Sequence, residues 1–292
     1  MVEFIEFTLE GISAGLIYAA IALSLVLIWR GTRVLNYSQG AMAMLTSFVA
    51  LEIVYVTGNY WLAFFVALIS GLAIGAAVER VVVRQVTGKP PLNAVIVTIG
   101  LLIGIEGLAG LLFGGNNRSF PSAFSANGLS IGSVALGITR NDIFTAVAVL
   151  LGAGLLAVIF QYTSIGLRLR ATAFNTPVAR LLGVRVGRML TLGWALAGLL
   201  GALAGMLVSP STLLSPNSMD TIFVLGFTAA VIGGLESPAG AVAGGVILGI
   251  VLSYAGGYLG SEVVNLFGLA ALLVVLMLRP TGLFSAAQAR RV

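Results

Sequence analysis

The sequence predicts an all-α integral membrane protein, a polytopic helical bundle with about nine spans. Of its 292 residues, 59% are hydrophobic and 9% are charged, whereas soluble domains carry about 25% charged residues. Apolar runs close to the length that crosses a bilayer, about 20 residues, recur along the whole chain. These runs are continuous and do not alternate with polar residues, which favours helices over a transmembrane barrel.

Nine apolar runs are candidate spans, and residues 1–292 are treated as one transmembrane domain. The second and seventh runs are short for a complete crossing and are candidates for re-entrant or broken helices. The nine runs cover residues 7–29, 41–56, 61–83, 92–113, 143–162, 189–208, 220–235, 239–258 and 263–278.

Positive charges set the predicted orientation. Thirteen of the 15 Lys and Arg residues fall in connections that alternate onto one face, which the positive-inside rule makes cytoplasmic. The N-terminus is therefore expected outside and the C-terminus inside, with a cytoplasmic loop at 163–188 and an outer loop at 114–142. Asp220, at the start of the seventh run, is assigned to the outer face. The same charge bias explains a sequence pI near 10.0 without a nucleic-acid partner.

The start of the chain, MVEFIEFTLE, is acidic and lacks the basic region of a cleaved signal peptide. The first apolar run is therefore expected to remain as a span.

Several kinds of chemistry are excluded by composition. The chain contains no Cys and no His, which removes disulfides, cysteine-based metal sites and histidine acid–base catalysis. It has no G-x-x-x-x-G-K-[ST] phosphate loop, so it is not expected to hydrolyse ATP or to be an enzyme. The stretch GISAG at 11–15 fits the G-x-S-x-G pattern but lacks the strand-to-helix turn and the histidine of a serine hydrolase. We expect no metal and no cofactor in this chain.

One polar stretch stands out between two apolar runs. Residues 166–188 contain five arginines, a third of all Lys and Arg. Thr176 and Pro177 predict a helix start, and Gly183 predicts its end. The two turns between them carry an apolar face at helical spacing, flanked by arginines; its members are Val178, Leu181 and Leu182. A helix this short needs a groove to stabilise it, although a solvated loop made basic by the positive-inside rule is equally consistent.

Six G-x-x-x-G pairs fall in or near spans, where small residues four apart let helices approach closely. We expect most of them to pack within the chain and a few to serve a contact between subunits. The pairs are Gly11/Gly15, Gly71/Gly75, Gly100/Gly104, Gly110/Gly114, Gly201/Gly205 and Gly245/Gly249.

Polar residues inside spans are candidates for a transport pathway or a subunit interface, because they are costly there. Glu52 and Glu106 lie in the second and fourth runs, and hydrogen-bonded packing is an equally consistent role for both. Glu79, next to Arg80, is expected to be an ion-paired anchor.

A polar cluster, NYSQG at 36–40, lies between the first two runs. Asn36 and Gln39 in it are further pathway or interface candidates, and a plain loop that caps the second span explains them as well. Asn93 and Thr98, in the fourth run, complete the set.

The stretch LRLRATAFNTPVARLLGV resembles the cytoplasmic loop of ABC-importer permeases of the branched-chain amino-acid type. In that family an Arg-Ala-x-Ala-x-Asn stretch leads into Ala-x-Leu-Leu-Gly-Ile/Val, and the loop is the coupling helix that docks into a cytoplasmic ATPase. The resemblance implies an ATPase-coupling role for Arg170, Ala171, Asn175, Pro177, Val178, Ala179, Leu181, Leu182 and Gly183.

Other stretches, in the same order along the chain, resemble the same family and cover nearly all of it. They are GISAGLIYAAIALSLVLIW, VLNYSQGAMAML, VERVVVRQVTG with LNAVIVTIG, FTAAVIGGLESPAGAVAGGVILGI, and LRPTGLF. Two departures stand out. Ala41 follows Gln39-Gly40 where members often carry a polar residue, which puts the lining of a pathway in doubt. Glu236 replaces a usual Gly, which we treat as tolerated variation in a turn.

The resemblance implies the membrane subunit of an ATP-driven importer in a bacterial or archaeal cytoplasmic membrane. Its implied partners are membrane lipid, a second permease (identical or homologous), two ATPases that carry ATP and Mg²⁺, and an extracytoplasmic binding protein. The implied substrates are branched-chain or other apolar amino acids, or urea and short amides. The rival hypothesis is an ion- or proton-coupled secondary transporter or channel, which would use intramembrane carboxylates and broken helices.

Overall fold

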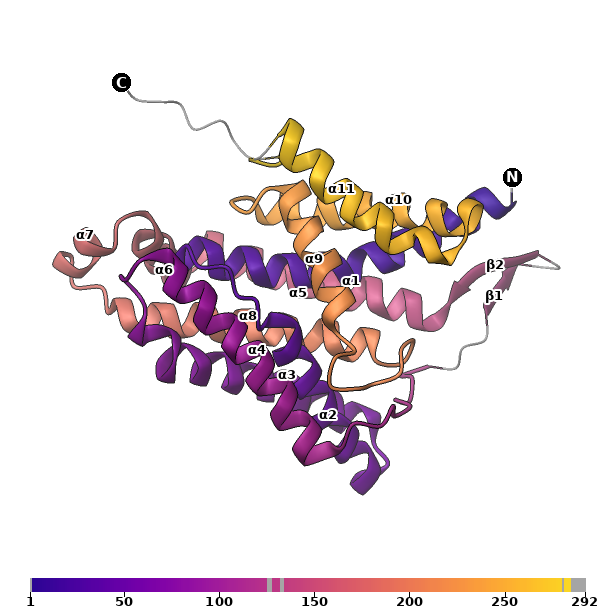
Figure 1. Cartoon of the computed structure of the whole chain (residues 1–292), viewed down its shortest axis with the longest axis horizontal. Helices are drawn as coiled ribbons and strands as arrows, with labels where there is room; N and C mark the ends of the chain where they lie inside the picture. The colour runs from indigo at the N-terminus through magenta and orange to yellow at the C-terminus, as the bar shows by residue number, and fades with distance from the viewer. Residues whose placement is uncertain (1, 125–127, 132–133, 280, 285–292) are drawn as a thin grey trace.

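The computed structural model describes residues 2–124, 128–131, 134–279 and 281–284 of the chain. It is a helical bundle with one short hairpin (Figure 1). The helices are α1 (Val2–Thr32), α2 (Gln39–Thr57), α3 (Tyr60–Val81), α4 (Pro91–Phe113), α5 (Arg140–Tyr162), α6 (Ser164–Phe174), α7 (Thr176–Leu181), α8 (Val186–Val208), α9 (Asp220–Gly233), α10 (Pro238–Leu259) and α11 (Val264–Leu278). Short 3-10 turns lie at Val83–Gln85 and Ser261–Val263.

The predicted fold class is confirmed, since each of the nine apolar runs forms a helix. Within the described residues, eight helices are long and apolar enough to cross a membrane. The exception is α9, the seventh run, whose 14 residues extend about 21 Å against a hydrocarbon core of about 30 Å. The second run forms a longer helix than expected, because α2 already begins at Gln39.

The segment expected as an outer loop contains regular structure. Strands β1 (Gly128–Ile131) and β2 (Val134–Thr139) form an antiparallel hairpin that leads directly into α5. Thr139 caps α5: its hydroxyl accepts from the Asp142 N–H, and the Asp142 carboxylate accepts from the Thr139 N–H. This capping box starts α5 at Arg140, before the predicted boundary.

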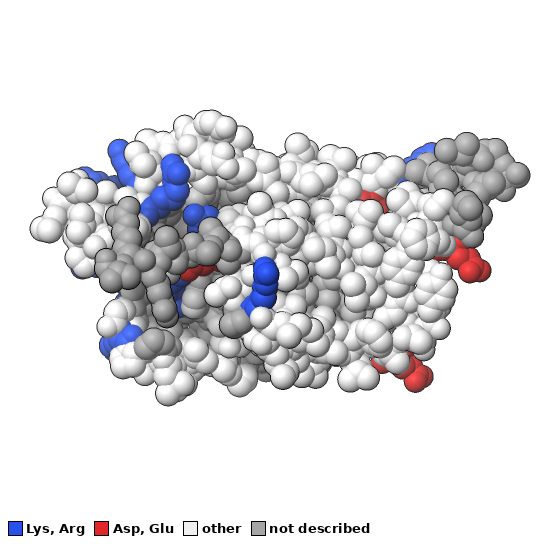
Figure 2. Space-filling view, turned by 90° about the horizontal axis from the view of Figure 1, so that it is seen from above, with Lys and Arg blue, Asp and Glu red and all other residues white. Residues whose placement is uncertain are grey.

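The bundle has two ends, named here the α7 end and the hairpin end (Figure 1). At the α7 end, Arg33 after α1 forms an ion pair with Glu236 in the α9–α10 turn. At the hairpin end, the Ser13 hydroxyl donates to Asp142 over 2.8 Å. Figure 2 shows most of the visible Lys and Arg toward the α7 end and most of the visible Asp and Glu toward the hairpin end. Arg290 and Arg291, counted above among the inside charges, lie outside the described residues.

Two long antiparallel helix pairs form the centre of the bundle, α1 with α10 and α3 with α8. Glycines bring the backbones together: Gly15 faces the Gly245 carbonyl, and Gly75 faces the Trp194 carbonyl. The predicted packing role of G-x-x-x-G pairs within the chain is thereby confirmed for four pairs. These are Gly11/Gly15, Gly71/Gly75, Gly201/Gly205 and Gly245/Gly249.

The two central pairs belong to an inverted internal repeat. Helices α1 to α4 correspond in order to α8 to α11: α2 packs on α3 and α8, as α9 packs on α10 and α1. Likewise α4 packs on α2, and α11 on α9. Because α1 and α8 run in opposite directions, the second set is inverted relative to the first, a plan found in transporters.

Both α2 and α9 begin inside the bundle rather than at an end. The Gln39 side-chain amide donates to the Ala197 carbonyl, midway along α8, and Gly40 lies against Phe223 in the first turn of α9. Irregular segments, 33–38 from the α7 end and 209–219 from the hairpin end, lead to these two starts. Asp220 is thus placed part-way along the bundle, at the first residue of α9 and with its side chain exposed, and its assignment to the outer face stays a prediction. The seventh run is a half-length helix that lacks its first turns.

Candidate functional site

The polar cluster before α2 is a buried hydrogen-bond network. Asn36, Ser38 and Gln39 are each at most 1% exposed. The Asn36 amide donates to Gln39 Oε1 over 2.9 Å, and the Ser38 hydroxyl donates to Asn36 Oδ1 over 2.7 Å. Every side chain of this network has a hydrogen-bond partner. The network can therefore stabilise the non-helical backbone of segment 33–38 where it is buried within the bundle.

Two neighbouring helices hold this network in place. On α8, a Cβ at Gly201 would overlap Gln39 Nε2, so the glycine makes room for the amide. On α4, the buried Thr98 hydroxyl lies 3.3 Å from the Leu35 carbonyl and 3.0 Å from the Ala94 carbonyl. Asn36, Gln39 and Thr98, three of the predicted candidates, are therefore brought together.

Glu106 lies farther along α4, with its carboxyl group close to that of Asp220, the first residue of α9. Glu106 is half-buried and Asp220 is exposed, and both lie on the side of the bundle formed by α4, α9 and α11. Asp220 also lines a small depression of about 210 Å³ with Asn265 of α11. Asp220 sits at the positive end of the α9 dipole, which favours a negative charge there. Glu106 was identified in the sequence as a carboxylate inside an apolar run. Its neighbour Asp220 could not be identified in this way, because the two residues are far apart in the chain.

The face of α4 beside Glu106 is open. A Cβ at Gly100, Gly104 or Gly107 would meet nothing within 4 Å, and Ile103 is 65% exposed. Unlike the glycines of α1, α3, α8 and α10, these small residues have no helix packed on them within the described chain.

Glu52 and Asn93 lie apart from both groups. Glu52 accepts from Arg118 Nη1 over 2.7 Å, and the backbone of Arg118 pairs with Leu214 in the 209–219 segment. Glu52 thus ties α2 to two connections at the hairpin end. Asn93 lies half-buried in the first turn of α4. Among the described residues, no group of acidic side chains is placed to hold a metal ion.

The basic segment 163–188 forms two helices, α6 and α7, beyond the main bundle (Figure 1). The cap of α7 is Asn175, whose Oδ1 accepts from the Val178 N–H over 3.1 Å. The predicted cap Thr176 is instead the first helical residue, and its hydroxyl donates to the Thr172 carbonyl. Sequence inspection missed this shift because Asn and Thr are both good caps.

The end of α7 is confirmed at Gly183. This glycine has φ +81°, the Gly183 N–H donates to the Arg180 carbonyl, and the Val184 N–H donates to the Ala179 carbonyl. Such a left-handed glycine with both bonds forms a Schellman motif. The short helix is therefore closed by its own sequence at both ends.

The predicted apolar face of α7 is exposed. Leu181 is 87% exposed, Leu182 77% and Val178 46%. Phe174, at the end of α6, is 93% exposed. Ala179 faces inward and is buried. Exposed leucines on a two-turn helix form an apolar surface that a partner groove would cover.

A partly buried ion pair joins the end of α3 to the first turns of α8. Glu79 of α3 is 1% exposed and accepts two bonds from Arg84, of 3.1 and 2.8 Å. Arg84 also donates to the Gly187 carbonyl, and the Thr191 hydroxyl donates to Glu79. The expected anchor is real, but its partner is Arg84, not the exposed Arg80. The link to α8 was invisible in the sequence, since Thr191 lies 112 positions from Glu79.

Comparisons with known proteins identify a family for this chain. The family model described as the branched-chain amino acid transport system permease component matches residues 7–277. The chain belongs to this family.

Three relatives show the range of similarity. The permease is 28% identical to the high-affinity branched-chain amino acid transport permease LivH of Salmonella typhimurium, over 99% of this chain and 98% of the relative. It is 25% identical to BraD of Pseudomonas aeruginosa over the same shares of each chain. The fructose import permease FruF of Bifidobacterium longum is 27% identical over 82% of this chain and 67% of FruF. The permease is thus a LivH-like multi-pass membrane protein and not itself an enzyme.

Proposed function

We propose that this permease docks cytoplasmic ATPases on α7 and thereby couples ATP hydrolysis to import. The carrying observation is the exposed apolar face of Val178, Leu181 and Leu182 on a helix that is capped at both ends. A self-sufficient secondary transporter has no use for such a surface. ATP and Mg²⁺ would bind the ATPase subunits, one for each of two permeases, and this chain would hold no cofactor of its own.

The contacts of α7 offer a route for coupling. A displacement of α7 would reach α8 through the direct packing of α7 on α8 and through α6. The Glu79–Arg84 pair, in which Arg84 donates to the Gly187 carbonyl in the first turn of α8, would then link α8 to α3. Along α8, the Ala197 carbonyl holds the Gln39 amide at the start of α2. Movement at the α7 end would therefore be transmitted to the place inside the bundle where α2 begins.

The proposed orientation places the α7 end in the cytoplasm and the hairpin end outside, in a bacterial or archaeal cytoplasmic membrane. The support is the charge distribution, since basic residues favour the cytoplasmic side. A binding protein would then deliver substrate at the hairpin end.

A second permease, a homologue or another copy, would cover the open side of α4. Support comes from the uncovered Gly100, Gly104 and Gly107, which would let a second backbone approach. Glu106 and Asp220 would then lie on a pathway between the two subunits, since polar groups at depth are costly unless they face a partner or a wet cavity.

The proposed substrates are branched-chain or other apolar amino acids. Relatives are named for branched-chain amino acids and for fructose. The paired carboxylates of Glu106 and Asp220 are acceptor groups that suit the ammonium group of an amino acid, which favours amino acids over sugars, urea and short amides.

The docking proposal is tested by purifying the tagged permease from its own cells in mild detergent and identifying the proteins that accompany it. We expect an ATPase in stoichiometric amount, lost with Leu182→Asp and retained with Leu182→Met. Recovery of the permease alone, together with ATP-independent transport in proteoliposomes, would establish the secondary transporter instead.

A further inference from the structure

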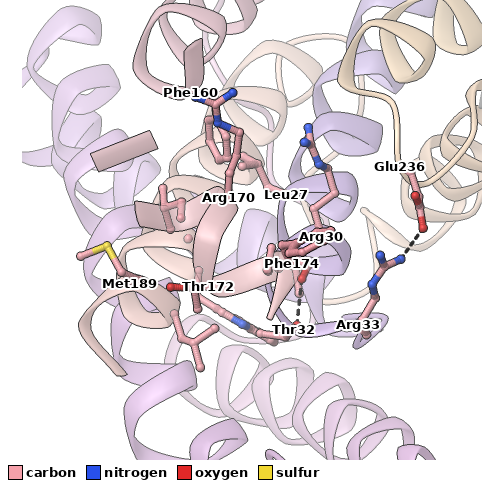
Figure 3. A pocket seen from close by; sticks show the side chains of 17 residues that line it. Leu27, Arg30, Thr32, Arg33, Phe160, Arg170, Thr172, Phe174, Met189 and Glu236 are labelled. Atoms are coloured by element: carbon pink, nitrogen blue, oxygen red, sulfur yellow. Dashed lines mark hydrogen bonds and ion pairs between the residues drawn. The ribbon is translucent and has the colours of Figure 1, made fainter. Parts of the chain in front are cut away.

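A pocket of about 320 Å³ opens at the α7 end between α1, α6 and α8 (Figure 3). It lies beside α7 but does not include the exposed apolar face of that helix. Three arginines line it: Arg30, Arg33 and Arg170. Arg33 is bonded to Glu236, the one acidic residue in the lining. In the described part of the chain, Arg30 and Arg170 form no ion pair.

The two unpaired arginines are neighbours. Figure 3 shows the side chains of Arg30 and Arg170 extending toward the same side of the pocket. Arg30 interacts with the charge of Glu236 and, less strongly, with that of Arg170. Like charges this close repel unless an anion lies between them. Guanidinium groups match the oxygens of a phosphate group in charge and geometry.

Two residues of the pocket lining carry buried polar atoms without a partner. Thr172 and Trp194 line the pocket and are each 1% exposed, yet Thr172 Oγ1 and Trp194 Nε1 have no hydrogen-bond partner. Buried donors are almost always satisfied, so these two indicate a bound group that offers acceptor oxygens. The indole N–H only donates, and therefore requires an acceptor.

The rest of the wall is apolar. It includes Leu27, Phe160, Met189 and Leu190. The pocket thus combines cationic, hydrogen-bonding and apolar side chains. A glycerophospholipid carries groups that complement all three, with an anionic phosphate, ester carbonyls and acyl chains. Inorganic phosphate would satisfy the arginines and leave the indole and the apolar wall unused.

We propose that this pocket binds the headgroup and glycerol ester region of an anionic phospholipid. Arg30 and Arg170 would bind the phosphate group, Trp194 and Thr172 would donate to ester carbonyls, and the apolar wall would receive the first part of an acyl chain. Basic pockets between helices near the membrane surface suit such lipids. A bound lipid would hold α6 against α1 and α8 just before α7 begins. The binding itself does not depend on the docking of ATPases.

The test uses delipidated full-length permease in a neutral detergent. Binding is measured by native mass spectrometry and by the shift in melting temperature, with phosphatidylglycerol, phosphatidylcholine and inorganic phosphate as probes. We expect phosphatidylglycerol to bind and stabilise. Phosphatidylcholine and phosphate should have little effect. Equal stabilisation by phosphatidylcholine would overturn the proposal, and equal stabilisation by inorganic phosphate would make this a simple anion site.

Variants assign the binding to this pocket. R30Q/R170Q should weaken phosphatidylglycerol binding about tenfold or more, since two charge-assisted contacts are lost. The matched control R80Q/R188Q removes two exposed arginines outside the pocket and should leave binding unchanged. Trp194→Phe keeps an aromatic ring, removes the N–H and should weaken binding several-fold. If the control pair loses as much affinity as R30Q/R170Q, or if Trp194→Phe binds like the wild type, the lipid lies elsewhere.

Discussion

The carboxylate of Glu79 is completely buried and accepts hydrogen bonds from Arg84 and Thr191. Removing one partner of a buried pair leaves an uncompensated charge. The free-energy cost of that charge exceeds the net stabilisation that the intact pair provides. Because Arg84 is 40% exposed, water screens part of this interaction.

Arg84→Met should therefore lower the free energy of unfolding by about 2 kcal/mol, less than the 3–5 kcal/mol of a fully buried pair. The measurement is denaturant or thermal unfolding of the purified permease in detergent. Arg80→Met, at the exposed neighbour, should change it by less than about 0.5 kcal/mol. The double variant E79Q/R84M should recover part of the loss, because it removes the stranded charge. Equal stability of the two single methionine variants would contradict the role of Arg84.

Asp220, at the start of α9, has its exposed carboxyl group close to that of Glu106 on α4. Asp220→Asn preserves its shape and removes its charge. Under the proposed function, it should reduce leucine uptake about tenfold or more, since a charge-assisted contact to an ammonium group is lost. Recovery of the permease with its ATPase should not change. Glu262→Gln, at an exposed acidic residue before α11, is the control and should transport normally. Unchanged leucine uptake by Asp220→Asn would remove the pair from the pathway.

At the scale of elements, α7 is a helix that depends on its caps. Two turns are too short to be stable alone, and α7 is held by Asn175 at one end and Gly183 at the other. Loss of an N-cap costs about 1 kcal/mol. Asn175→Ala should therefore fray α7 and lower ATP-driven uptake several-fold in proteoliposomes of the complete transporter. Asn175→Asp, which still caps, should retain uptake. Equal uptake by both variants would show that the order of α7 does not limit coupling.

The α3–α8 contact depends on a glycine with no space for a side chain. A Cβ on Gly75 would overlap the Trp194 carbonyl, which belongs to the backbone and cannot rotate away. Gly75→Ala should destabilise the permease by about 1–3 kcal/mol through overpacking. Gly104→Ala adds the same methyl group where nothing lies within 4 Å, so its unfolding in detergent should match the wild type. A wild-type melting temperature for Gly75→Ala would mean that the two helices separate more easily than the structure implies.

For the whole molecule, the orientation is open to a direct test, because the chain contains no cysteine. Single cysteines at Asn116, near the hairpin end, and Arg180, on α7, each replace an exposed residue. With an impermeant thiol reagent, N116C should be labelled in intact cells and R180C only after permeabilisation. The reverse pattern would invert the proposed topology and with it the docking of ATPases on α7.

The inverted repeat gives the whole molecule two helices, α2 and α9, that start inside the bundle. Each is preceded by an irregular segment of backbone. The polar side chains that satisfy the backbone before α2 are the ones that sequence inspection identified between the first two spans. The symmetry itself was missed. Helix packing reveals it, whereas the corresponding stretches have little sequence in common.

The sequence by itself determined the fold class, the nine apolar helices, the end of α7 and the family, because hydropathy, left-handed glycine and short motifs are local properties. Tertiary structure alone decided the partners: Arg84 and Thr191 for Glu79, Asp220 for Glu106, Arg118 for Glu52 and Ala197 for Gln39. It also decided which glycines are covered, and it gathered Arg30, Arg170 and Trp194 into one pocket. These pairings join residues far apart in the chain, and only the packing of one helix against another brings them within bonding distance.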